Sequence, residues 1–212
     1  MTKSTEQNPA VPFATLHPNL LMSIYRAFER VSGRGELGSY LEFGLYSGFS
    51  FWYANNLAHE MNLDIEFHGF DSFEGLPEST VDIHRNWAPG SYACTLEQCE
   101  ENFSKWGMPK KYFLHKGWYS EEFFSHISTP PPSIVVIDCD IYESAKTVLA
   151  YLKGQLAVGT ILIFDDFNAF GGDTNHGERR ALQEFEESYP NFRKRYLWKF
   201  GPYGEAFEVV AV

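Results

Sequence analysis

The chain has 212 residues, and its 28 acidic residues against 17 Lys and Arg give it a formal net charge of −11. This length supports one substantial α/β core and is short for two domains. The acidic balance argues against nucleic-acid binding, because phosphates are neutralised by a basic surface. The composition therefore favours an enzyme that acts on small molecules.

Residues 1–15 predict a flexible tail, and residues 16–212 predict a single domain. The tail lacks the apolar stretch of a signal peptide, and no segment approaches the length of a membrane span. Cys94, Cys99 and Cys139 show no metal-ligand spacing, so we expect reduced thiols in a cytoplasmic protein. Aromatic residues make up 17% of the chain, and we expect some of them to line a pocket or the interface of a homodimer or higher homo-oligomer.

Helical and strand-like patterns alternate along the chain. Apolar residues at helical spacing predict helices over residues 19–31, 49–61, 95–106, 120–127, 143–156 and 178–188. Short runs rich in aliphatic and aromatic residues predict strands over residues 39–43, 64–70, 112–115, 133–137 and 160–164. Thr95 and Gln98 have the spacing of a capping box at the start of their helix. The last predicted strands, 195–199 and 205–212, flank the turn Gly201-Pro-Tyr-Gly204.

Strands that alternate with helices imply right-handed crossovers and a doubly wound parallel sheet. The last two strands imply an antiparallel hairpin at the far side of that sheet. A long irregular stretch, residues 78–94, contains His84, Arg85, Trp87 and Tyr92. Connections of this length are typical of lids or binding segments, so we expect it to cover the site.

Two acidic pairs follow two of the predicted strands. Asp138 and Asp140 come after residues 133–137, and Asp165 and Asp166 come after residues 160–164. If these strands are neighbours, the carboxylates meet at the sheet edge where open α/β folds bind ligands. A single Asp there is expected to cap the next helix, but two matched pairs favour a divalent cation such as Mg²⁺.

The turn after the first strand, Glu42-Phe-Gly-Leu-Tyr-Ser-Gly48, contains glycines but no GxGxxG motif. This weakens a dinucleotide-binding interpretation. Asp71, at the end of the second strand, is placed to bind both hydroxyls of a nucleoside ribose. A tight turn and a turn-initiating Asp explain the same residues without a ligand.

Five motifs in order along the chain resemble the macrocin O-methyltransferase family, which uses S-adenosylmethionine. They are Leu41-Glu-Phe-Gly44, Phe70-Asp-Ser-Phe-Glu-Gly-Leu-Pro77, His115-Lys-Gly-Trp118, Asp138-Cys-Asp-Ile-Tyr-Glu-Ser144 and Phe164-Asp-Asp166. The resemblance covers about residues 36–190. It implies an α/β fold of the class I methyltransferase type, a Rossmann-like doubly wound sheet of seven strands.

The resemblance also implies site residues and two cofactors, S-adenosylmethionine and Mg²⁺. The implied cofactor-binding residues are Glu42, Gly44 and Ser47 at the methionyl part, Asp71 and Ser72 at the ribose, Gly117 and Trp118 at the adenine, and Asp138 beside them. The implied Mg²⁺ ligands are Asp138, Asp165 and Asp166, with Asp140 as general base.

The predicted activity is the transfer of a methyl group to a hydroxyl of a small acceptor, which is a sugar, a diol or a phenol. Vicinal oxygens would chelate the metal best, and the metal would lower the pKa of the hydroxyl. Along an extended strand Asp138 and Asp140 share one side and Cys139 points away, which separates the ligand from the base. His176 is the second candidate base.

Two other functions compete with this one. A non-catalytic partner protein that binds S-adenosylmethionine fits the same fold, but it has no need for all four acidic residues. A nicotinamide-dependent oxidoreductase is disfavoured because the GxGxxG motif is missing.

Overall fold

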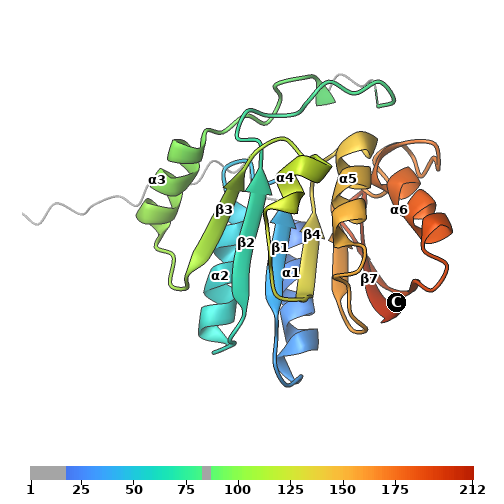
Figure 1. The fold of residues 1–212 in the computed structure, drawn as a ribbon. Coiled ribbons are helices and arrows are strands. Elements are labelled where there is room, and N and C mark those ends of the chain that lie inside the picture. Colours follow the sequence, from blue (N-terminus) through green and yellow to red (C-terminus); the bar gives the residue numbers. More distant parts are fainter. Residues whose placement is uncertain (1–17, 83–86) are drawn as a thin grey trace, which may run out of the picture.

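The computed structural model describes residues 18–82 and 87–212, which form a seven-stranded sheet between two layers of helices (Figure 1). The strands are β1 (Ser39–Phe43), β2 (Glu66–Asp71), β3 (Tyr112–Lys116), β4 (Pro132–Ile137), β5 (Ile161–Phe164), β6 (Arg193–Phe200) and β7 (Gly204–Ala211). The helices are α1 (Pro18–Ser32), α2 (Phe49–Glu60), α3 (Leu96–Trp106), α4 (Glu121–Ser125), α5 (Tyr142–Leu152) and α6 (Gly177–Ser188).

The strand order is β3-β2-β1-β4-β5-β7-β6. Strands β1 to β5 pair in parallel, whereas β7 is antiparallel to both β5 and β6. The predicted doubly wound sheet and its antiparallel C-terminal hairpin are therefore confirmed. Since β4 and β5 are neighbours, their carboxyl ends bring the two acidic pairs to the same place.

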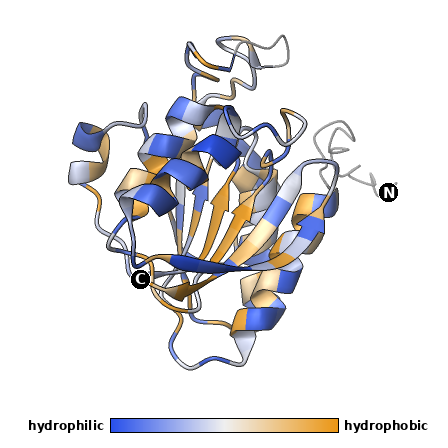
Figure 2. Cartoon of the chain, turned by 90° about the vertical axis from the view of Figure 1, so that its right-hand side faces the viewer, coloured by the Kyte–Doolittle hydropathy of each residue, from blue (hydrophilic) through white to orange (hydrophobic). Residues whose placement is uncertain are grey.

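The central strands are apolar on both faces because helices cover both (Figure 2). Alternate residues point to opposite sides, so Ile134 and Val136 of β4 pack with α1 and α2, whereas Val135 and Ile137 pack with α5 and α6. The helices carry hydrophilic residues on the sides that face away from the sheet (Figure 2).

The predicted helices are confirmed with small differences at their ends. The capping box of α3 is present, since Thr95 accepts from the Gln98 N–H and Gln98 reaches back to the Thr95 N–H. Helix α5 ends at Leu152, earlier than predicted, and Gly154 beyond it adopts φ 87°. No helix in the described ranges is both long and apolar enough to cross a membrane.

Candidate active site

A cavity of about 720 Å³ opens at the carboxyl edge of the sheet. Its walls come from the β1–α2 turn, the ends of β2, β4 and β5, the start of α1, and the turn between β6 and β7. Of the irregular stretch 78–94, Glu78, Trp87 and Tyr92 line this cavity. His84 and Arg85 lie outside the described residues. A volume of this size is typical of small-molecule sites.

The glycine turn after β1 lies directly against the end of β4. Gly44 adopts φ 91°, and a Cβ atom there would lie 1.7 Å from the carbonyl oxygen of Asp138. Only glycine permits so close an approach. The Gly44 N–H donates to the carbonyl of Phe70 at 2.9 Å, which fixes the turn to β2. Gly44 and Ser47 both line the cavity, as the cofactor prediction requires.

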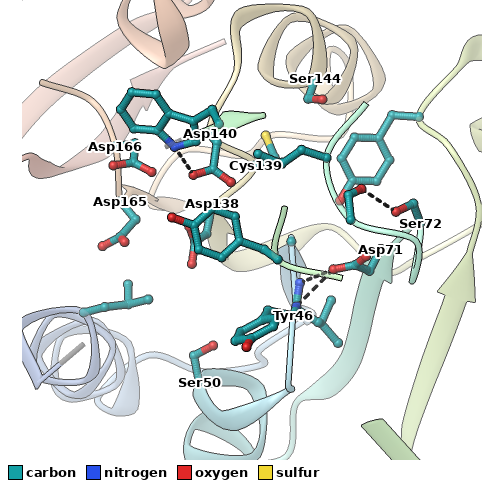
Figure 3. A pocket seen from close by; sticks show the side chains of 18 of the residues that line it. Tyr46, Ser50, Asp71, Ser72, Asp138, Cys139, Asp140, Ser144, Asp165 and Asp166 are labelled. Carbon is teal, nitrogen blue, oxygen red and sulfur yellow. Dashed lines mark hydrogen bonds between the residues drawn. The ribbon is translucent and has the colours of Figure 1, made fainter. Parts of the chain in front are cut away.

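Asp71 lines the cavity and also holds the glycine turn (Figure 3). Its Oδ2 accepts from the N–H groups of Leu45 and Tyr46 at 2.7 and 3.1 Å, and its Oδ1 accepts from the Phe73 N–H at 2.7 Å. Burial raises the pKa of Asp71, and these backbone donors oppose the rise. The carboxylate therefore supports the local backbone, a role that the sequence did not indicate. Its predicted contact with a ribose stays a prediction.

Ser72, Gly117 and Trp118 line the same part of the cavity. The Ser72 hydroxyl donates to the Gly75 carbonyl at 2.9 Å and accepts from the Glu74 N–H at 3.0 Å. The Gly117 N–H donates to the Asp71 carbonyl at 3.0 Å, which places the exposed Trp118 ring at the rim. The predicted contact of Gly117 and Trp118 with an adenine stays a prediction.

Glu42 is completely buried on the α2 side of β1 and is not among the described residues that line the cavity. Its carboxylate accepts from the Tyr40 hydroxyl and, at 2.5 Å, from the Ser50 hydroxyl. Burial raises the pKa of Glu42 to about 7. Ser50 does line the cavity, so Glu42 is connected to it through Ser50.

Asp138, Asp165 and Asp166 form an acidic cluster at the ends of β4 and β5 (Figure 3). Each offers a carboxylate oxygen, and these atoms lie within 4.8 Å of one another. Burial and the neighbouring Asp165 raise the pKa of Asp138 well above its usual range. Burial and a neighbouring carboxylate raise the pKa of Asp165 to about 7 and that of Asp166 to about 6. Three hard oxygen donors that repel one another fit a divalent cation.

Asp140 lines the cavity beside the acidic cluster, but the prediction that strand alternation directs its side chain there is wrong. Strand β4 ends at Ile137, and Asp140 adopts a left-handed φ of 62°, so strand alternation does not extend to this residue. Cys139 is buried with the core residues of α5 and α6. The indole N–H of Trp87 donates to Oδ1 of Asp140 at 2.5 Å and orients the carboxylate.

His176 lies apart from these groups and is not among the described cavity-lining residues. Its Nδ1 lies 3.1 Å from Oδ1 of Asp82, and its ring stacks on Phe170 at 5.1 Å. Asp82 is buried and also accepts from the N–H groups of Tyr142 and Gly177. No local motif marks Asp82, so its role could not be predicted from the sequence.

Glu178 is a second buried acid that the sequence analysis missed. Its Oε2 accepts from the Asp166 N–H at 3.1 Å, whereas its Oε1 has no hydrogen-bond partner in the described part of the chain. Burial and the nearby Asp166 raise the pKa of Glu178 well above its usual range. An acidic residue in the first turn of the helix that follows the acidic pair was the only sequence signal.

The fold is that of class I methyltransferases, as structural comparison confirms. The O-methyltransferase NovP superposes with a TM-score of 0.76 at 18% identity, over 90% of this chain and 79% of that one. A calicheamicin-pathway enzyme, the TDP-rhamnose 3'-O-methyltransferase CalS11, superposes with a TM-score of 0.60 at 21% identity, over 95% of this chain and 88% of that one.

The sequence profile of the macrocin-O-methyltransferase (TylF) family matches residues 3–189, so the chain belongs to this family. A curated relative from Streptomyces olivaceus is 27% identical over 176 residues. It is named 8-demethyl-8-(2,3-dimethoxy-alpha-L-rhamnosyl)-tetracenomycin-C 4'-O-methyltransferase. The match covers 75% of this chain and 64% of the relative, so it leaves about a third of the relative unmatched.

Proposed function

We propose that this protein transfers the methyl group of S-adenosylmethionine to a hydroxyl of a sugar or another diol. The observation that carries the proposal is that one cavity joins the glycine turn and Asp71 to the acidic cluster of Asp138, Asp165 and Asp166. The relative and the neighbour described above are both named for O-methylation of a rhamnose unit. Membership of the family supports the same reaction class.

The proposed cation ligands are Asp138, Asp165 and Asp166. Their raised pKa values arise from burial and mutual repulsion, and a cation relieves that repulsion. When bound, a divalent cation here would lower the pKa of an acceptor hydroxyl. All the protein ligands are carboxylates, which suits Mg²⁺ better than a softer metal.

Asp140 is the proposed general base, because it lines the cavity next to the acidic cluster and Trp87 fixes its orientation. When bound, S-adenosylmethionine would supply the methyl group, so that the hydroxyl oxygen would form a bond to the methyl carbon and the electron pair of the broken carbon–sulfur bond would stay on sulfur. The hydroxyl proton passes to the base. His176 is the weaker candidate, since Asp82 holds its Nδ1 away from the cavity.

A first experiment separates the competing functions. Calorimetry with S-adenosylmethionine and with NAD⁺, each with and without Mg²⁺, should show binding of the former alone. Methyl transfer is then measured with a panel of glycosides, diols and catechols. Binding without transfer to any acceptor would favour the non-catalytic partner protein, and preferential binding of NAD⁺ would contradict the proposal.

The metal is tested with a matched pair of variants. Asp165→Asn removes a proposed ligand, so it should raise the Mg²⁺ concentration needed for half-maximal activity at least tenfold. Asp173→Asn makes the same change at an exposed position of the same loop and should behave like the wild type. Full activity in excess chelator would refute the metal dependence.

A further inference from the structure

Helices α5 and α6 begin close to the two pairs of acidic residues and lie side by side (Figure 1). The first four N–H groups of any helix lack partners within the helix. Within the described ranges, neither helix is capped by the side chain of its own N-cap residue, which is Ile141 for α5 and His176 for α6. Their first N–H groups therefore need an acceptor from elsewhere.

Asp82 supplies that acceptor to both helices. Its Oδ2 accepts from the Tyr142 N–H of α5 at 2.6 Å, and its two oxygens lie 3.2 Å from the Gly177 nitrogen of α6. His176 Nδ1 lies 3.1 Å from Oδ1. The Asp82 side chain is fully buried. The positive ends of two helix dipoles and an imidazole N–H thus converge on one carboxylate.

This shared cap is connected both to Asp138, which follows β4, and to Asp165 and Asp166, which follow β5. On the α5 side, the chain runs from Tyr142 back to Asp140 and Asp138, and the Ile141 N–H donates to the Cys139 carbonyl at 2.7 Å. On the α6 side, Glu178 in the first turn holds the Asp166 N–H at 3.1 Å. A change in the spacing of the two helix starts would therefore change the spacing of the carboxylates.

We infer that Asp82 and His176 are a positioning pair, in which His176 donates to Asp82 and is not the base. The pair sets the distance between the two loops that carry the proposed cation ligands, which follow β4 and β5. The inference rests on the proposed function for the cation itself. Neither residue is among the described residues that line the cavity, so both act through the backbone of α5 and α6.

Asp82→Asn tests the cap directly. The amide keeps one acceptor oxygen but turns an NH₂ group towards the other helix start, so only one helix stays capped. With Mn²⁺ as the probe, titrated by electron paramagnetic resonance without acceptor, we expect binding at least tenfold weaker than in the wild type. S-adenosylmethionine affinity should stay within twofold, since Asp71 is held by the N–H groups of Leu45, Tyr46 and Phe73 and not by α5 or α6.

Glu184→Gln is the matched control. Glu184 of α6 also links the two helices, because it accepts from Lys146 and Tyr142 of α5, but it does so where these side chains are partly exposed. The Glu184→Gln variant should therefore bind Mn²⁺ with the same affinity as the wild type. Equal Mn²⁺ affinity in the wild type and Asp82→Asn would overturn the inference. No Mn²⁺ binding in the wild type would instead contradict the proposed function.

His176 provides a second test that does not depend on the folding of Asp82→Asn. An Asn side chain places its NH₂ group where His carries Nδ1, whereas Gln does not. His176→Asn should therefore keep kcat and Mn²⁺ affinity within about threefold of the wild type, and His176→Gln should weaken Mn²⁺ binding. A loss of kcat above a hundredfold in both variants, with Mn²⁺ affinity unchanged, would show that His176 is the base and overturn the assignment.

Discussion

The raised pKa of the buried Glu42 carboxyl predicts that the stability of the protein depends measurably on pH. The carboxyl group is completely buried, and its pKa rises from the usual 4.5 to about 7. As pH increases, the unfolded chain therefore loses this proton before the folded protein does. The contribution of Glu42 to stability is full below pH 4.5 and falls by about 3 kcal/mol once pH exceeds 7, at about 1.4 kcal/mol for each unit of pKa difference.

Glu42→Gln removes the titrating group and keeps its contacts. Both partners, Tyr40 and Ser50, are hydroxyls that donate or accept, so an amide can bond to each of them. Between pH 5 and pH 8 the wild type should lose about 2.5 kcal/mol more stability than the variant. For a chain of this size that equals roughly 5–10 °C in Tm.

The assay is urea unfolding followed by circular dichroism, at half-unit steps from pH 5 to pH 8 in the presence of a chelator. The carboxylates of the acidic cluster titrate in both proteins, so most of their effect cancels in the difference, and Asp165 contributes only as a minor cause of the raised pKa of Glu42. Glu101→Gln, an exposed residue of α3 paired with Lys105, is the control and should parallel the wild type. Parallel curves for the wild type and Glu42→Gln would refute the assigned pKa.

Three further predictions concern the cavity. Asp71→Asn should weaken S-adenosylmethionine binding by about 1.5–3 kcal/mol, because a hydrogen bond to a charged group is lost, and unchanged affinity in calorimetry would contradict the ribose contact. Asp140→Asn should lower kcat by about 10²–10⁴-fold with cofactor affinity intact; normal turnover would exclude Asp140 as the base. Mg²⁺ should raise Tm more at pH 8 than at pH 5, because Asp165 and Asp166, with pKa values of about 7 and 6, must lose protons to bind it; equal shifts in scanning calorimetry would argue against these ligands.

The sequence predicts those parts of the site that follow directly from a strand. Asp138 and Asp165 come straight after runs of buried apolar residues, so the fold brings them together once the two strands are known to be neighbours. Asp82 and Glu178 could not be found in this way. Asp82 lies 60 residues from Tyr142 and 95 from Gly177, and only the packing of α5 against α6 brings these groups together.

The geometry of Asp140 shows a different limit. The strand period predicts side-chain direction only while the strand lasts, and β4 ends three residues before Asp140. Beyond that point a left-handed residue reorients the chain, and a contact with Trp87, 53 positions away, sets the carboxylate. Asp140 lines the cavity, but strand alternation does not explain its position there, and its role as the base stays a prediction.

The buried carboxylates at this sheet edge differ in their neighbours. Some accept from backbone N–H groups, whereas others face further carboxylates, and a cation is expected at the latter. Asp71 accepts from three backbone N–H groups, and Asp82 accepts from two helix starts and lies against an imidazole nitrogen. Their charge is therefore met by fixed dipoles. Asp138, Asp165 and Asp166 face one another, so each raises the cost of ionising the next. A divalent cation bound by these three residues would relieve this repulsion, whereas Asp71 and Asp82 support the surrounding backbone through the N–H groups that they accept from.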